Sequence, residues 1–118
     1  MEIKNYRDLR VWQSGMDLVV MVYELSDKFP AKEMYGLTSQ IRRAAVSVPS
    51  NIAEGYGRNS SKERKQFISL ARGSAAEVEA QLTVSRELGF VTSLDSTKAE
   101  QLVTEVLKML TGLRKSLA

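Results

Sequence analysis

Six polar residues between positions 40 and 58 recur at helical spacing, and their side chains are of the kinds that build hydrogen-bonded sites. They are Gln40, Arg43, Ser47, Asn51, Glu54 and Arg58. The spacings of 3, 4, 4, 3 and 4 would place them along one edge of a helix. Amides, a hydroxyl, a carboxylate and two guanidiniums on one edge suit a network between helices or subunits, or a ligand surface. The alternative is an ordinary hydrated helix face.

Positive charge is concentrated in the same part of the chain. The whole sequence has a formal net charge of +3, whereas residues 42–72 contain seven basic and two acidic residues, a net charge of +5. A segment of this kind can contact the phosphates of a nucleic acid. The predicted nucleic-acid-binding residues are Arg42, Arg43, Arg58, Lys62, Arg64, Lys65 and Arg72.

The glycine-rich, basic segment 55–62 leads into a predicted helix start. Free backbone N–H groups, the positive end of a helix dipole and nearby cations together favour an anion site there. The alternative is a flexible loop with solubilising charge. The spacing of a P-loop is absent.

The sequence contains no cysteine and no histidine. Disulfides, thiolate chemistry, zinc sites with the usual ligands and histidine-based triads are therefore excluded. Glu54, Glu77 and Glu79 could suggest a metal, but carboxylate-bridged helical bundles pair such groups with Glu-x-x-His. We therefore expect no catalytic residue, no metal, no cofactor and no enzymatic activity.

Apolar residues recur with helical period through four stretches, and these helices must position the polar groups. The pattern predicts helices over about residues 8–28, 32–56, 60–88 and from 92 onward. Asp8 is the predicted N-cap of the first helix, Ser60 with Glu63 makes a capping box for the third, and Gly89 ends it. The third helix is predicted to turn Phe67, Leu70, Ala71, Ala75, Val78, Leu82 and Leu88 inward.

The connections between these helices are short, which favours antiparallel neighbours. The length suits one core. We predict a single all-α domain over residues 1–118, an antiparallel up-down-up-down four-helix bundle that assembles as a ring-like homo-oligomer.

The first predicted helix is apolar over about 220° of its circumference, whereas a surface helix needs only about 100°. One stripe consists of Leu9, Trp12, Met16, Val19, Val20 and Tyr23. The second stripe is predicted to hold subunits together and consists of Val11, Leu18, Val22 and Leu25. Small residues that let another helix approach, Gly73, Ala76 and Ala80, are predicted to join this interface. The alternative is a central helix flanked by its own neighbours.

Six segments carry a family resemblance. They are residues 9–13 (LRVWQ), 29–30 (FP), 33–37 (EMYGL), 40–45 (QIRRAA), 47–55 (SVPSNIAEG) and 71–74 (ARGS). Together they resemble the bacterial four-helix-bundle family named for open reading frames within 23S ribosomal RNA intervening sequences. The resemblance implies an up-down bundle and a homopentamer. A more distant likeness to the accessory protein of diversity-generating retroelements implies binding to nucleic acid and to a reverse transcriptase.

These features favour a non-enzymatic homo-oligomer that binds RNA or DNA, or a complex of nucleic acid with a nucleic-acid enzyme. The alternative is a protein-binding or structural scaffold in which the arginines hold subunits together. The first twelve residues lack the pattern of a signal peptide, and no apolar run approaches 20 residues. We therefore expect a cytoplasmic protein with no membrane partner.

Overall fold

The computed structural model describes residues 5–117, which form four α-helices and no strand. The helices are α1 (Arg10–Ser26), α2 (Leu37–Tyr56), α3 (Ser61–Glu87) and α4 (Ser93–Ser116). Short 3-10 turns precede the first two, η1 (Tyr6–Asp8) and η2 (Ala31–Glu33). The all-α prediction is confirmed for this part of the chain.

The ends of α3 and the start of α4 follow the local sequence signals. The Ser60 hydroxyl accepts from the Glu63 N–H at 3.1 Å, and the Thr92 hydroxyl accepts from the Asp95 N–H at 3.0 Å. Gly89 has a φ of 75°, and the N–H of Phe90 donates to the Ser85 carbonyl at 2.9 Å. These are the bonds of a Schellman ending, in which a glycine takes the left-handed conformation. The predicted starts of the last two helices and the stop at Gly89 are confirmed.

The predicted starts of the first two helices were wrong. Asp8 lies in η1, and Leu9 occupies the N-cap position of α1 without a side-chain cap. The helix expected from residue 32 begins at Leu37, because Pro30 and Gly36 both have non-helical ψ values. The Glu33 carboxylate then accepts from the Leu37 N–H at 3.1 Å, so a residue outside the helix satisfies one of its first donors.

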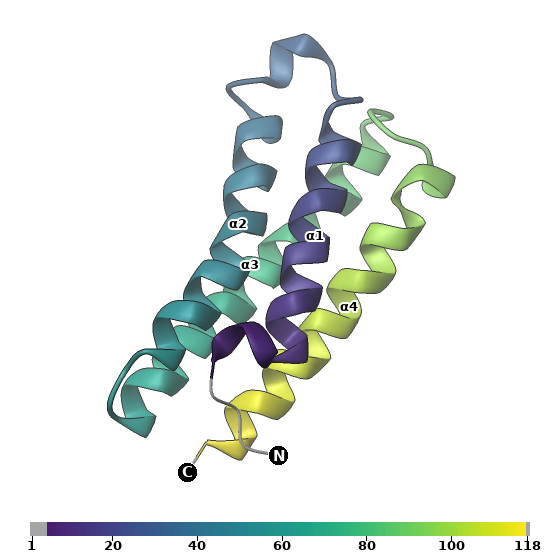
Figure 1. Ribbon diagram of the computed structural model, residues 1–118. Helices are drawn as coiled ribbons and strands as arrows, with labels where there is room; N and C mark the ends of the chain where they lie inside the picture. The colour runs from purple at the N-terminus through teal and green to yellow at the C-terminus, as the bar shows by residue number, and fades with distance from the viewer. Residues whose placement is uncertain (1–4, 118) are drawn as a thin grey trace.

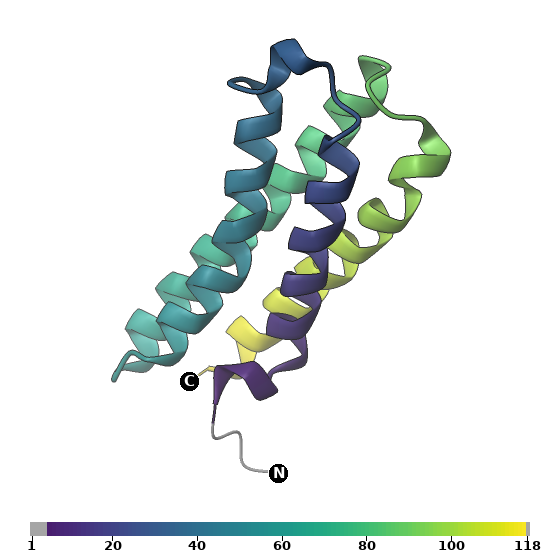
Figure 2. The ribbon, with the colours of Figure 1, turned by 45° about the horizontal axis from the view of Figure 1, so that its top comes forward.

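The four helices form an elongated bundle measuring 43 × 25 × 19 Å (Figure 1). In sequence order each helix contacts the next, and α1 also contacts α4. The η2 segment and the α3–α4 turn lie at one end of the bundle. The α2–α3 turn, the start of α1 and the end of α4 lie at the other end, as the rotated view also shows (Figure 2).

The core is aliphatic and draws on all four helices. Its fully buried large side chains are Leu18, Ile41, Ile52, Leu82, Leu110 and the valines 22, 48, 78, 103 and 106. In α3, Leu70 and Leu88 were predicted to face inward but are exposed, whereas Ile68 is buried. Ile68 lies three residues before Ala71 and seven before Ala75, so it belongs to their face of the helix.

The second apolar stripe of α1 was wrongly assigned to a subunit interface. Val11, Leu18, Val22 and Leu25 are all buried within this single chain. They belong to the core cluster of the bundle, so they are not available to a second copy of the folded chain. The first stripe is instead the outward one, since Met16, Val20 and Tyr23 are exposed.

Candidate functional site

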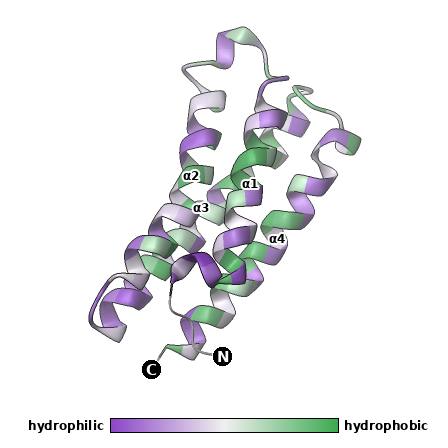
Figure 3. Ribbon diagram, viewed as in Figure 1, coloured by the Kyte–Doolittle hydropathy of each residue, from purple (hydrophilic) through white to green (hydrophobic). Residues whose placement is uncertain are grey.

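The fold separates the charges of the chain along the bundle axis. We divide each helix at its midpoint and call the half that contains the α2–α3 turn the basic end; it consists of residues 5–17, 48–72 and 105–117. This end carries ten basic and five acidic residues, a formal net charge of +5. The opposite half of the described chain carries six basic and eight acidic residues. The α2–α3 turn is strongly hydrophilic (Figure 3).

Arg42, one of the predicted nucleic-acid-binding residues, is engaged within its own chain. Its Nε donates to the Ser26 hydroxyl at 2.7 Å, and its Nη2 pairs with the Asp27 carboxylate at 2.8 Å. The guanidinium also stacks on the Tyr23 ring at 4.7 Å and lies 3.4 Å from the Tyr23 carbonyl. A cation here satisfies the last turn of α1, where helix carbonyls lack partners. Arg42 therefore fastens α2 to the end of α1.

Arg58 and Arg64 shape the α2–α3 turn. Arg58 pairs with Glu54 at 2.9 Å and stacks over the Phe67 ring at 4.7 Å. The Nε of Arg64 donates to the Arg58 carbonyl at 2.9 Å. Both arginines thus hold the turn in place while adding positive charge to it.

The remaining predicted cations have no carboxylate partner among residues 5–117. Arg43 and Lys62 are exposed, and Lys65 is partly exposed. Arg72 points to α4, where its Nε donates to the Thr111 hydroxyl at 3.0 Å. Lys62 and Lys65 lie in the first turns of α3, beside the positive end of its dipole. This is the part of the predicted region whose charge is open to a ligand.

The polar edge of α2 faces α3 and forms a network between these two helices. Ser74 and Ser47 share a hydrogen bond of 2.8 Å, and the Asn51 amide donates to the Ser47 hydroxyl at 2.8 Å. The Gln81 amide lies 3.4 Å from both Gln40 and Glu77. A groove of about 340 Å³ follows this edge, lined by Gln40, Arg43, Ala44, Ser47, Ser74 and Glu77. The sequence interpretation of a hydrogen-bonded network between helices is confirmed for these members.

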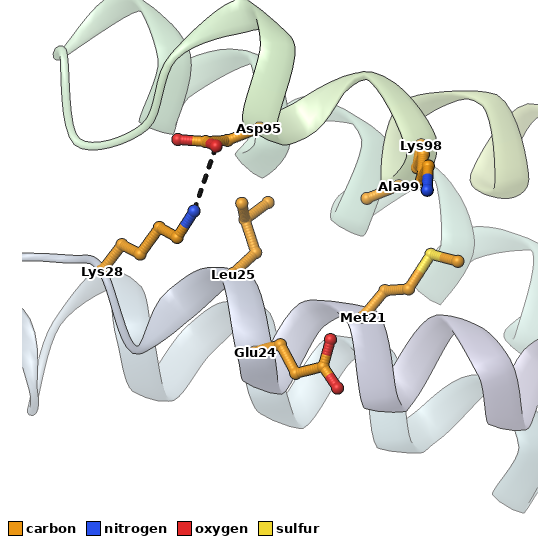
Figure 4. A pocket seen from close by; sticks show the side chains of 7 residues that line it. All are labelled: Met21, Glu24, Leu25, Lys28, Asp95, Lys98 and Ala99. Carbon is orange, nitrogen blue, oxygen red and sulfur yellow. Dashed lines mark ion pairs between the residues drawn. The ribbon is translucent and has the colours of Figure 1, made fainter.

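A second groove, of about 370 Å³, lies between α1 and α4 at the end opposite the α2–α3 turn (Figure 4). Met21, Leu25 and Ala99 form its apolar part. Its charged residues are of both signs, Glu24, Lys28, Asp95 and Lys98. Because these charges compensate, the groove does not attract anions as the basic end does.

The Lys28 ammonium lies 3.0 Å from the Asp95 carboxylate across this groove. The hydrogen bond from Lys28, together with one from Thr92, holds the pKa of Asp95 below its usual value of 3.8. This pair fastens the end of α1 to the start of α4.

An apolar surface covers the outer side of α1 and the adjoining part of α2. Met16, Val20, Tyr23 and Val46 are exposed there. Beside them, Tyr6 and Trp12 meet edge to face at 5.4 Å in a groove of about 320 Å³.

The predicted small interface residues Gly73, Ala76 and Ala80 are all exposed on α3. Exposed apolar surface of this kind is typical of protein contacts.

Among the described residues, no group of three or more acidic side chains is placed to hold a metal ion. No helix in the same part of the chain combines the length and apolarity needed to cross a membrane.

Sequence reasoning did not identify the residues of α4 that lie beside the basic region. Thr111 accepts from Arg72 of α3, and Arg114 donates to Ser69 of α3, with sequence separations of 39 and 45 residues. Only the pairing of the two helices could bring these residues together, since no local pattern marks them.

Comparisons with known proteins agree with this architecture. The family model of the 23S rRNA-intervening sequence protein matches residues 7–112. A crystal structure of a Bacteroides thetaiotaomicron protein of unknown function, from the S23 ribosomal protein family, is similar with a TM-score of 0.82. The sequences are 21% identical, and the likeness covers 89% of this chain and 98% of the other. At this identity it concerns the fold alone. No curated protein matches the chain.

Proposed function

The chain belongs to the family of 23S rRNA-intervening sequence proteins, and we propose that it is a non-enzymatic, homo-oligomeric module that binds nucleic acid through its basic end. Structured RNA is the ligand proposed first, with duplex DNA as the comparison. A complex of nucleic acid with a nucleic-acid enzyme is also a ligand under this proposal. The proposed location is the cytoplasm, where bacterial nucleic acids lie.

The observation that carries this proposal is the separation of charge along the bundle. Ten of the basic residues in the described chain gather at one end, and they come from η1, α1, the α2–α3 turn, α3 and α4. Lys62 and Lys65 have no carboxylate partner among residues 5–117, so their charge is not neutralised within this part of the chain. A polyanion gains binding free energy from such a surface by releasing condensed counterions.

Self-association is the second part of the proposal. An antiparallel up-down-up-down bundle would assemble through the outer side of α1, where Met16, Val20 and Tyr23 are exposed. A ring of five copies is the state that the family resemblance implies. Repeating the basic end around a ring would multiply weak contacts into substantial avidity.

A protein-binding scaffold is the competing function, and one observation favours it. Tyr35 is 98% exposed and Leu94 is 86% exposed, and both lie at the end opposite the basic end. Large apolar side chains that are so exposed are suited to a protein partner.

The absence of enzymatic activity rests on the residue types. With neither histidine nor cysteine in the sequence, histidine-based acid–base pairs and thiolate nucleophiles are absent. We expect no turnover of nuclease or phosphatase substrates with or without Mg²⁺. Reproducible cleavage that is lost in Glu54→Gln would contradict this.

Fluorescence anisotropy tests the binding function directly. Structured RNA and duplex DNA are titrated with the protein at about 50 and 200 mM salt, where phosphate contacts lose affinity steeply. The variant Lys62→Gln/Lys65→Gln should bind more weakly and with a shallower salt dependence. The matched control is Lys32→Gln/Lys98→Gln, which removes the same charge from exposed residues of the opposite half.

Equal losses of affinity in the two double variants would show that affinity depends on the net charge of the protein and not on the position of the lysines at the basic end. If neither nucleic acid binds at low salt, nucleic-acid binding is wrong. The scaffold function would then be tested by replacing Tyr35 and Leu94.

A further inference from the structure

Two arginines cross between α3 and α4 in a reciprocal arrangement. Arg72 of α3 donates from Nε to the hydroxyl of Thr111 on α4 at 3.0 Å. Arg114 of α4 donates from Nε to the hydroxyl of Ser69 on α3 at 2.8 Å. Each helix therefore supplies one guanidinium and the hydroxyl that orients the other.

These bonds fix the guanidiniums without neutralising them. The Thr111 hydroxyl donates in turn to the Leu107 carbonyl at 2.9 Å, which sets the direction of the lone pair offered to Arg72. Only the Nε atoms are used, so the Nη groups of Arg72 and Arg114 retain their donors. Within residues 5–117, no carboxylate lies within ion-pair distance of either arginine.

Three other arginines of the bundle are bound differently. Arg42, Arg58 and Arg86 each pair with a carboxylate, at 2.8 to 3.1 Å. Arg72 and Arg114 are held by neutral hydroxyls, which preserves their full charge for an anion.

The groove beside Arg72 has the composition of an anion site. A groove of about 360 Å³ is lined by Arg72, Thr104, Leu107, Lys108 and Thr111. Two of these five residues are cations, two carry hydroxyls and none is acidic. Lys108 lies one turn before Thr111 on the same face of α4, and it too has no ion pair in the described chain.

We propose that the α3–α4 groove, lined by Arg72 and Lys108 and extended by Arg114 one turn beyond Thr111 on α4, binds the phosphodiester backbone of the nucleic acid. This inference rests on the proposed function and assigns its phosphate contacts to a surface that includes α4. Guanidinium groups match phosphate oxygens with paired N–H donors, and the cross-helix bonds orient these donors before binding. Because the fixed rotamers need not be ordered on binding, the groove loses less entropy than free lysines would.

The test uses the salt dependence of affinity for structured RNA, with duplex DNA measured in parallel. Each lost phosphate contact lowers the slope of log K against log salt by about 0.7 to 0.9. Arg72→Gln/Arg114→Gln should therefore reduce the affinity loss between about 50 and 200 mM salt by about tenfold. The charge-matched control Lys32→Gln/Lys98→Gln should keep the slope of the unmodified protein. Thermal melting followed by circular dichroism establishes that each variant is folded, and Lys108→Gln serves as a third probe of the groove.

A second pair of variants tests the positioning role of the hydroxyls. Ser69→Ala/Thr111→Val keeps every charge but releases both guanidiniums, so it should weaken binding several-fold at low salt. An arginine effect without any hydroxyl effect would contradict the positioning role.

The outcomes separate this inference from the proposed function. Binding by the unmodified protein with the arginine variant indistinguishable from the control would overturn the groove and leave the basic end standing. Absence of binding at low salt by the unmodified protein would overturn both.

Discussion

Gly55 of α2 lies directly against Phe67 of α3. A Cβ atom built at Gly55 would lie 2.7 Å from the Phe67 Cβ, and 3.4 Å from the Arg64 carbonyl oxygen. Carbon atoms in favourable contact are about 3.5 to 4.0 Å apart, so any side chain at position 55 would force the helices apart. This close approach sets the geometry of the α2–α3 turn, which carries Arg58 and leads into the first turn of α3 with Lys62.

Replacing Gly55 by alanine should destabilise the protein by about 1 to 3 kcal/mol, the usual cost of overpacking a well-packed contact. Urea unfolding measures the change. The matched control is Gly112→Ala in α4, where nothing lies within 4 Å of an added Cβ. That variant should be stabilised by about 0.5 to 1 kcal/mol, because alanine favours the helix over glycine. Equal effects at the two sites would show that the contact with Phe67 is unimportant.

Val20 and Val22 of α1 should respond in opposite ways to the same substitution. Val22 is 0% exposed, so Val22→Asp buries an unpaired carboxylate and should unfold the chain, at a cost of several kcal/mol. Val20 is 54% exposed, so Val20→Asp should keep the helical fold and reduce self-association. Circular dichroism reports the fold, and light scattering reports the mass. A 13.2 kDa monomer for the unmodified protein would contradict the oligomer.

Arg42 and Arg43 form a matched pair for the structural and exposed arginines. Arg42→Gln removes an ion pair and a hydrogen bond to the end of α1, so it should cost about 1 to 3 kcal/mol of stability. Arg43→Gln should change stability by less than about 0.5 kcal/mol, as is usual for a surface substitution. Arg42→Lys should not restore the loss, because an ammonium cannot make the same forked contacts. Denaturant midpoints of the three variants measure these changes in stability.

The ion pair of Lys28 and Asp95 predicts a particular dependence of stability on pH. Because folding lowers the pKa of Asp95 below 3.8, the pair stabilises the folded state fully above that pH. The contribution is lost as pH falls through the lower pKa of the folded protein. The stability difference between the unmodified protein and Lys28→Gln should therefore be constant near neutral pH and shrink below about pH 4. An NMR titration should find the Asp95 pKa below 3.8 and returning toward it in Lys28→Gln.

Local sequence signals determined the parts of the structure that depend on a few neighbouring residues. Ser60 with Glu63, Thr92 and Gly89 marked the ends of helices correctly, because caps and left-handed glycines act within one turn. The helical period likewise determined the all-α class. Asp8 failed as a cap because the chain before α1 forms a separate 3-10 turn, and nothing in its local sequence distinguishes the two outcomes.

Tertiary structure alone decided which face of α1 is buried and which cations are open to a ligand. The two stripes of α1 are similarly apolar in sequence, so only packing against α2 and α4 selected the one that contains Leu18 and Val22. Arg42 and Arg43 are adjacent and identical in type, yet only Arg42 meets Asp27. Arg72 donates a hydrogen bond to the Thr111 hydroxyl, which lies 39 residues away on another helix. Sequence determines such features only through the complete packing of the chain, because the free energy of each contact depends on a partner that local pattern does not specify.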